Sequence, residues 1–222
     1  MSTSSAKPSY RTPLLAAVAG VVLLALVFAF AVGLPEADDE ESAAAADPVV
    51  ETLVDLPDSL PGDLVALTSP EMPDDLVEQT GGAEKIAEIT ASAAENVADI
   101  FGGPADFGLY GKVDGSALLT VTVAPGEPGL FVPDGAPVSA DVQGVERSDL
   151  EIVRVGDAVC SVLYTQAVAS GQTVDPDEQP ARVHCQLGSS GLLYDVTGQG
   201  LSVESTVAAG EAVLQNQADS KS

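Results

Sequence analysis

The sequence predicts an α+β protein: an N-terminal transmembrane helix, a flexible acidic linker containing prolines, then a mostly antiparallel β-sheet with two flanking helices. Three observations predict this fold. An uncharged apolar run covers residues 14–34, an amphipathic helical pattern covers residues 83–101, and alternating apolar segments with glycine-containing turns fill most of the chain beyond residue 104. Helices and strands that are segregated along a chain, rather than strictly alternating, are typical of α+β folds.

The apolar run from Leu14 to Leu34 has the length of a membrane-spanning helix. At about 1.5 Å rise per residue it crosses a hydrocarbon core of roughly 30 Å. Lys7 and Arg11 precede it, and the first acidic residue, Glu36, follows it. By the positive-inside bias, we expect residues 1–13 to be a cytoplasmic tail and residues 14–34 to span the lipid bilayer of the cell membrane once. The C-terminal part is then extracytoplasmic.

Secretion after cleavage near Ala31 is the alternative. Ala29-Phe30-Ala31 has the small-x-small pattern that signal peptidase accepts. The apolar stretch of a signal peptide is usually about 7–15 residues long. Because this run continues to Leu34, the sequence favours a retained signal anchor.

Acidic residues dominate the chain beyond residue 34, where 34 Asp and Glu stand against 6 Lys and Arg. This field repels phosphate backbones and anionic head groups, so nucleic-acid binding and docking on acidic membranes are disfavoured. The chain is nevertheless 45% hydrophobic, which predicts a folded core rather than disorder over its whole length.

The exported part is expected to contain one domain. Residues 35–80 show no sustained period and are rich in Pro and acids, which predicts an acidic linker or an irregular lead-in. The α+β domain is expected over residues 81–216, and a disordered tail over residues 217–222. The best helix runs from Ala83 to Phe101 and ends at Gly102-Gly103-Pro104. Its apolar face, expected to be a core seam, comprises Ile86, Ile89, Ala93, Val97 and Ile100.

Three hairpins are expected beyond this helix. Their strand pairs cover residues 107–113 with 118–124, 150–155 with 158–168, and 181–187 with 192–197. Shorter strands are expected over residues 130–132 and 138–142, and a closing helix over residues 202–215. We expect both helices to pack on one face of the sheet.

Cys160 and Cys185, the two cysteines of the chain, both fall in predicted strands on the oxidising side of the membrane. Alternation along residues 181–187 turns Cys185 inward, with His184 on the opposite face. A structural disulfide between Cys160 and Cys185 is therefore favoured over two free buried thiols. A redox pair or a zinc site is weakly supported, because the cysteines are far apart in sequence and further ligands are scarce.

No catalytic or cofactor motif is present in the sequence. His184 is the single histidine, and its outward direction predicts an ordinary solvated side chain. Nucleophile-elbow and phosphate-loop spacings are missing. Acids at Asp134-Gly135 and at Asp175, Asp177 and Glu178 leave calcium binding open, although neither stretch matches an EF-hand loop. We expect no cofactor.

With its anchor, acidic lead-in and the cysteine-containing segments 156–160 and 183–186, the chain loosely resembles uncharacterised single-pass extracytoplasmic proteins of actinobacteria. This resemblance implies no activity and no site residues. We expect a non-catalytic domain that binds an envelope protein or a ligand at the cell surface. The alternatives are a small-ligand or cation sensor, with a concave pocket, and an envelope-polymer hydrolase, with a pocket that holds His184 or two close carboxylates.

Overall fold

A computed structural model describes residues 53, 55–129 and 135–219. The predicted tail, the apolar run of residues 14–34 and the linker up to residue 52 lie outside the described residues. Contacts divide the chain after Asp47, and the part from Pro48 onward forms a compact unit. Among the described helices, none is long and apolar enough to cross a membrane.

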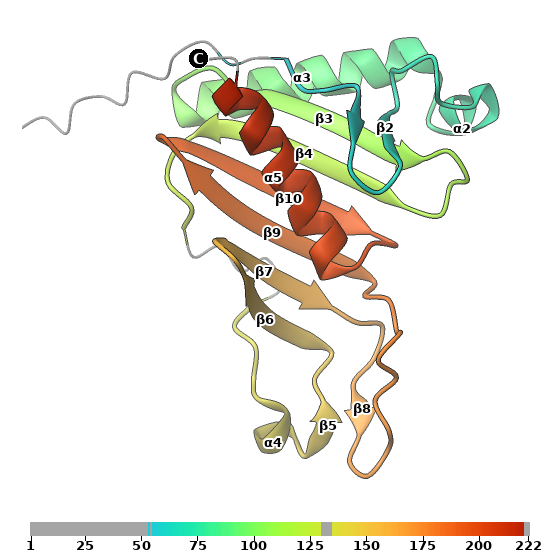
Figure 1. Cartoon of the computed structure of the whole chain (residues 1–222), viewed down its shortest axis with the longest axis vertical. Helices are drawn as coiled ribbons and strands as arrows, with labels where there is room; N and C mark the ends of the chain where they lie inside the picture. Colours follow the sequence, from blue (N-terminus) through green and yellow to red (C-terminus); the bar gives the residue numbers. More distant parts are fainter. Residues whose placement is uncertain (1–52, 54, 130–134, 220–222) are drawn as a thin grey trace, which may run out of the picture. The chain divides into compact units, whose positions relative to one another are not determined.

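An eight-stranded antiparallel sheet forms the centre of the fold, in the order β1-β2-β3-β4-β10-β9-β7-β6 (Figure 1). This confirms the mostly antiparallel sheet of the α+β prediction. A second, two-stranded sheet pairs β5 with β8. The strands are Ser59–Leu60 (β1), Leu64–Ala66 (β2), Asp106–Lys112 (β3), Leu118–Pro125 (β4), Val145–Arg147 (β5), Leu150–Val155 (β6), Ala158–Leu163 (β7), Val168–Ala169 (β8), Arg182–Ser189 (β9) and Leu192–Gln199 (β10).

The three predicted hairpins are present as β3–β4, β6–β7 and β9–β10. Local turn chemistry explains the first of them. Gly115 adopts a φ of +71°, which glycine allows without strain. Asp114 Oδ1 accepts hydrogen bonds from the Ser116 hydroxyl at 2.6 Å and from the Ser116 backbone N–H at 2.9 Å. These bonds lower the pKa of the Asp114 carboxyl.

The two long helices, α3 (Ala83–Phe101) and α5 (Val203–Asp219), cover opposite faces of the sheet. A Cβ built on Gly210 of α5 would lie 2.8 Å from Leu187 and 3.1 Å from Val196, so α5 packs on the face that carries these side chains. Val97 of α3 instead lines a cavity with Gln186, the sequence neighbour of Leu187. Because neighbouring strand residues point to opposite faces, the expectation that both helices share one face is wrong.

Each face has its own apolar core. The larger core lies under α5, and its largest fully buried side chains include Tyr110, Tyr194 and Leu64. The smaller core lies on the α3 face and consists of Val65, Leu67, Met72 and Ile86, with Leu76, Val77 and Leu109 packed against it. Val65 and Leu67 therefore pack into the smaller core, whereas Leu64 packs into the larger one.

Helix α3 has the predicted bounds, and its C-cap Gly102 is left-handed, with a φ of +70°. The predicted core seam of α3 is only partly correct. Ile86 is buried, and Ala93 and Val97 are half-buried. Ile89 and Ile100 are 40% and 78% exposed. Periodicity gives the apolar side of a helix but not how much of that side its neighbours cover.

Ile86 and Ile100 should respond differently to the same truncation. Ile86→Val removes a buried methylene group and should lower the free energy of unfolding by about 1 kcal/mol. Ile100→Val should change it by less than about 0.5 kcal/mol, because the side chain is exposed. Urea unfolding followed by far-UV circular dichroism measures both. Equal losses would contradict the exposure of Ile100.

The described segment before α3 belongs to the folded domain from Ser59 on, so the linker or irregular lead-in expected over residues 35–80 contains elements of regular structure spread over nearly half of its length. It contributes β1, β2 and a short helix, α2 (Asp74–Gln79). Tyr110 donates a hydrogen bond from its hydroxyl to the Pro57 carbonyl at 2.9 Å. Burial, with smaller contributions from Asp106 and Asp58, raises the pKa of the Tyr110 phenol, so this donor keeps its proton. The pairing of β2 with β3, which is distant in the sequence, has no local sequence signal.

Two further expectations need correction. Residues 138–142, expected to be a strand, instead include the start of the short helix α4 (Ala140–Gln143). The disordered tail expected over residues 217–222 begins too early, because α5 continues to Asp219 and Gln217 is buried. The strand expected over residues 130–132 lies outside the described residues.

The strand expected over residues 158–168 ends at Leu163, and the chain then enters a small extension made of β5, β8 and α4. Arg147 anchors this extension. Its guanidinium lies 3.6 Å from the centroid of the Tyr164 ring and 3.0 Å from a Glu178 carboxylate oxygen. Burial is the main cause that raises the pKa of Tyr164.

Candidate functional site

A cavity of about 390 Å³ opens between α3 and the sheet face beneath it. We call it the α3 pocket. Its wall on the helix side consists of Val97 and Phe101, which lie one helical turn apart. The connection after β4 contributes Glu127 and Gly129. The floor comes from three adjacent strands and consists of Thr122 and Ala124 of β4, Leu193 and Asp195 of β10, and Gln186 of β9.

Strand register arranges the floor in two rows. Asp195 pairs with Thr122 on one side and with Gln186 on the other, which gives a polar row across β4, β10 and β9. The next row on the same face begins with the pair Ala124 and Leu193 and is apolar. Antiparallel pairing places directly opposed side chains within contact distance. The pocket is therefore polar at one end of its floor and apolar at the other.

Asp195 is the centre of the polar row. Its Oδ2 lies 2.6 Å from His184 Nε2 and accepts a hydrogen bond from Gln186 Nε2 at 3.1 Å. Both contacts end on Oδ2, so neither uses the lone pairs of Oδ1. The Asp195 side chain is 28% exposed, and it is the part of this cluster that reaches the cavity with a charge.

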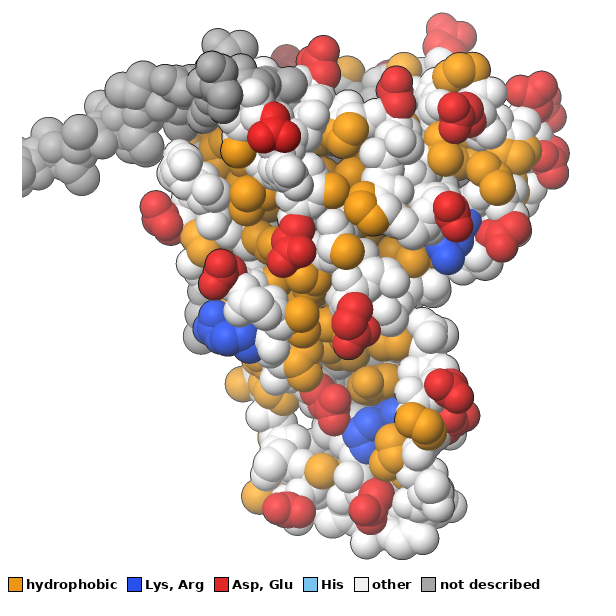
Figure 2. Space-filling model, in the orientation of Figure 1, with side chains coloured by type: hydrophobic (Ala, Val, Ile, Leu, Met, Phe, Trp, Pro, Cys, Tyr) orange, Lys and Arg blue, Asp and Glu red, His pale blue; other side chains and the backbone are white. Residues whose placement is uncertain are grey.

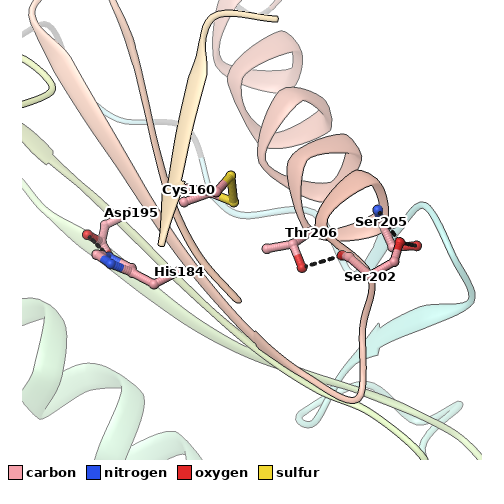
Figure 3. The surroundings of a disulfide bond; sticks show 7 residues. Cys160, His184, Asp195, Ser202, Ser205 and Thr206 are labelled. Atoms are coloured by element: carbon pink, nitrogen blue, oxygen red, sulfur yellow. Dashed lines mark hydrogen bonds and ion pairs between the residues drawn. A yellow bond between two sulfur atoms is a disulfide. The ribbon is translucent and has the colours of Figure 1, made fainter. Parts of the chain in front are cut away.

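The solvated His184 expected from the sequence is not found. The residue is only 6% exposed, and its ring is directed at Asp195 (Figure 3). Alternation along β9 is as predicted, but the second face of the sheet is covered as well. Asp195 and Gln186 were missed as site residues. The sequence did carry a signal for them, since each strand of the β9–β10 hairpin has a polar residue on the same face of the sheet.

The position of Ser161 bears on hydrolase chemistry. Ser161 on β7 is directly opposite His184 on β9, so serine, histidine and Asp195 follow one another across three neighbouring strands. Ser161 Oγ, however, is buried without a hydrogen-bond partner among the described residues, and neither Ser161 nor His184 lines the α3 pocket. A nucleophile must reach its substrate, and Ser161 does not reach the cavity. This arrangement therefore suits a histidine that positions the Asp195 carboxylate better than a serine that carries out acyl transfer.

The predicted disulfide between Cys160 and Cys185 is present. The two residues are direct partners on β7 and β9, with their Cα atoms 4.0 Å apart, and both are fully buried. Figure 3 shows the sulfurs on the α5 side of the strands and the pair His184–Asp195 on the other side. The bond thus ties together two of the strands behind the polar cluster without contributing to the α3 pocket.

The acids considered for calcium have other roles where they are described. Asp175 Oδ1 accepts a hydrogen bond from the Asp177 backbone N–H at 2.9 Å, and Glu178 pairs with Arg147. Asp134 lies outside the described residues. Within the described part of the chain, no three His, Cys, Asp or Glu side chains converge closely enough to hold a metal ion.

Acidic side chains are spread over the α5 face, where Lys and Arg are few (Figure 2). Around the α3 pocket the same bias holds, because the described lining residues include two acids, Glu127 and Asp195, and no Lys or Arg. Comparison with known proteins yields no matching family, no matching curated protein and no matching solved structure.

Proposed function

We propose that this protein is a membrane-tethered extracytoplasmic domain that binds a small, largely apolar ligand in the α3 pocket without transforming it. The observation that carries the proposal is the pocket itself. Its volume of about 390 Å³ falls within the range of roughly 300–1,000 Å³ that is typical of small-molecule sites. Its composition, apolar walls with a few convergent polar groups, is also typical of such sites.

Three features support ligand binding over the other functions considered. A concave pocket with the Asp195 cluster at its floor is what a ligand-binding domain needs, whereas a docking surface for a large partner is usually flatter and larger. The missing convergence of acids among the described residues gives no support to a cation sensor. Burial of Ser161 Oγ gives none to a hydrolase.

The tether rests on the apolar run of residues 14–34 and on the charges around it. An anchored domain would meet its ligand in the cell envelope. The disulfide supports this placement, since structural disulfides are formed and kept in oxidising compartments. The acidic composition would keep the domain away from anionic head groups and leave it free to sample the envelope.

Occluding the pocket should abolish ligand binding. Val97 lines the helix wall, and Val97→Phe places an aromatic ring into the cavity. We expect the uncharged fluorescent probe N-phenyl-1-naphthylamine to bind residues 48–222 and to lose affinity at least tenfold, about 1.4 kcal/mol, in this variant. Ala124→Phe enters the cavity from the sheet side and should have the same effect.

Val142→Phe is the matched control. It makes the same substitution on α4, at a side chain that is 78% exposed and does not line the α3 pocket. Melting curves and far-UV spectra show whether each variant is folded. Probe affinity that is unchanged in both occluding variants, while they remain folded, would refute ligand binding in this pocket.

A further inference from the structure

We propose that the ligand is an amphiphile whose protonated amine rests on Asp195 and whose apolar tail lies against α3. This inference names the ligand class for the function proposed above and rests on it. Four features carry it: the hydrogen bonding of Asp195, the charge of the lining, the order of polar and apolar groups along the floor, and the side chains of the opposite wall.

The Asp195 carboxylate is held in place before any ligand arrives. His184 and Gln186 both contact Oδ2, and both residues are more than nine-tenths buried. A carboxylate positioned in this way loses little freedom on binding. Among the described residues, both contacts of the carboxylate are to Oδ2 and none is to Oδ1, and Gln186 lines the cavity floor beside it. An ammonium group, which brings three donors and no acceptor, complements Oδ1.

The charge of the lining selects against an anionic head group. Glu127 and Asp195 both line the pocket, and Lys and Arg are missing from its described lining. The surrounding chain adds to the effect, because its formal net charge is −26. A fatty acid would thus place its carboxylate next to like charge in a partly desolvated site, which is unfavourable.

The position of the tail follows from the apolar row. Ala124 and Leu193 form the floor next to Asp195, and Val97 and Phe101 face them from α3. A tail that extends from an amine on Asp195 therefore passes between two apolar surfaces. Phe101 is 49% exposed, so ligand burial would also cover part of an aromatic ring that water now contacts.

Three ligands with the same ten-carbon tail test the head group. Decylamine, decanol and decanoic acid compete with N-phenyl-1-naphthylamine for residues 48–222, whose two apolar cores lie within that part of the chain. The measurement is made at pH 7, at physiological salt and below the concentrations at which the ligands aggregate. We expect decylamine to bind at least tenfold more tightly than decanoic acid, with decanol between them.

Two variants assign the preference to the pocket. Asp195→Asn removes the charge and keeps the shape, and it should reduce the ratio of amine to acid affinity at least fivefold. Glu127→Gln changes an exposed side chain, so it tests the same electrostatic effect without risk to folding and should reduce the ratio by a smaller factor. Direct binding of decylamine, measured by isothermal titration calorimetry because the probe does not bind this variant, should be lost in Val97→Phe, which separates pocket binding from attraction to the acidic surface.

The outcomes separate this inference from the proposed function. If the probe itself does not bind, the proposed function fails. If the probe binds in the pocket but none of the three ligands displaces it, the amphiphile assignment is wrong and the proposed function stands. If decanol or decanoic acid binds as tightly as decylamine, the pocket binds apolar ligands but the amine assignment is wrong. A preference for decylamine that survives both charge substitutions would also overturn the role of Asp195.

Discussion

Replacing both cysteines should strongly destabilise this domain. Cys160 and Cys185 are 25 residues apart, and closing a loop of this length constrains the unfolded chain by about 3.5 kcal/mol in the chain-entropy model. Both side chains are fully buried, so Cys160→Ala with Cys185→Ala also leaves a small void. The melting temperature of residues 48–222 should fall by roughly 7–14 °C, given about 2–4 °C per kcal/mol for a domain of this size.

Reduction of the unmodified protein provides the control. Dithiothreitol opens the bond and leaves both sulfur atoms in place, so its effect isolates the cross-link from the void. We expect the reduced protein to melt below the oxidised protein and slightly above the double-alanine variant. Thiol labelling of the oxidised protein without reductant should detect no free cysteine. Full labelling of both cysteines, or equal melting of the oxidised and reduced forms, would contradict a structural bridge.

Gly200→Ala should destabilise the protein almost as strongly. Gly200 joins β10 to α5 and has a φ of +68°, a conformation that costs an alanine about 1–2 kcal/mol. A Cβ there would also clash with the Ser116 backbone carbonyl oxygen, so the β3–β4 turn would have to move. Overpacking of this kind typically costs about 1–3 kcal/mol, and we expect a total loss of about 2–5 kcal/mol.

Gly102→Ala is the matched control, because Gly102 has a φ of +70° and no atom within 4 Å of an added Cβ. It should lose the conformational cost alone, about 1–2 kcal/mol. Urea unfolding of the two variants under the same conditions measures the difference. If Gly200→Ala were no worse than Gly102→Ala, the close approach of residue 200 to the β3–β4 turn would be incorrect.

Elements with local signals were predictable from the sequence. Helix α3 has its predicted bounds because an amphipathic pattern meets a Gly-Gly-Pro stop at Gly102. The hairpins follow from turn residues between alternating strands, as at Asp114 and Gly115. Predicting the cysteine bridge required only that the cysteine side chains point inward and that the expected compartment be oxidising. In each case the information lies within a few residues of the element itself.

Features that depend on distant contacts were not predictable. Residues 59–66 form the last two strands at one side of the sheet because β2 pairs with β3, about 45 positions further along the chain. All the apolar residues on one side of α3 were expected to be buried, yet Ile100 has too few neighbours to be buried. Alternation along β9 assigned the correct faces but could not show that helices cover both of them. The face of β9 that carries polar residues was therefore expected to be exposed to solvent.

This last error concealed the site. On β9 and β10, His184, Gln186 and Asp195 occupy the face opposite the larger core, where solvated polar residues are normal. Only the register and the helix above them reveal that the three side chains form a hydrogen-bonded cluster at the floor of a cavity. The α3 pocket itself has no sequence motif, because its walls come from one helix, three strands and a connection.

The most direct test of the proposed function is a methyl NMR titration of residues 48–222 with decanol, whose uncharged head group makes the result independent of the amine assignment. We expect the methyl signals of Val97, Ala124 and Leu193 to shift together and saturate, while those of Val138 and Val142, which do not line the α3 pocket, stay in place. Shifts that are confined to Val138 and Val142, or no saturable shift at all, would contradict a ligand site between α3 and the sheet.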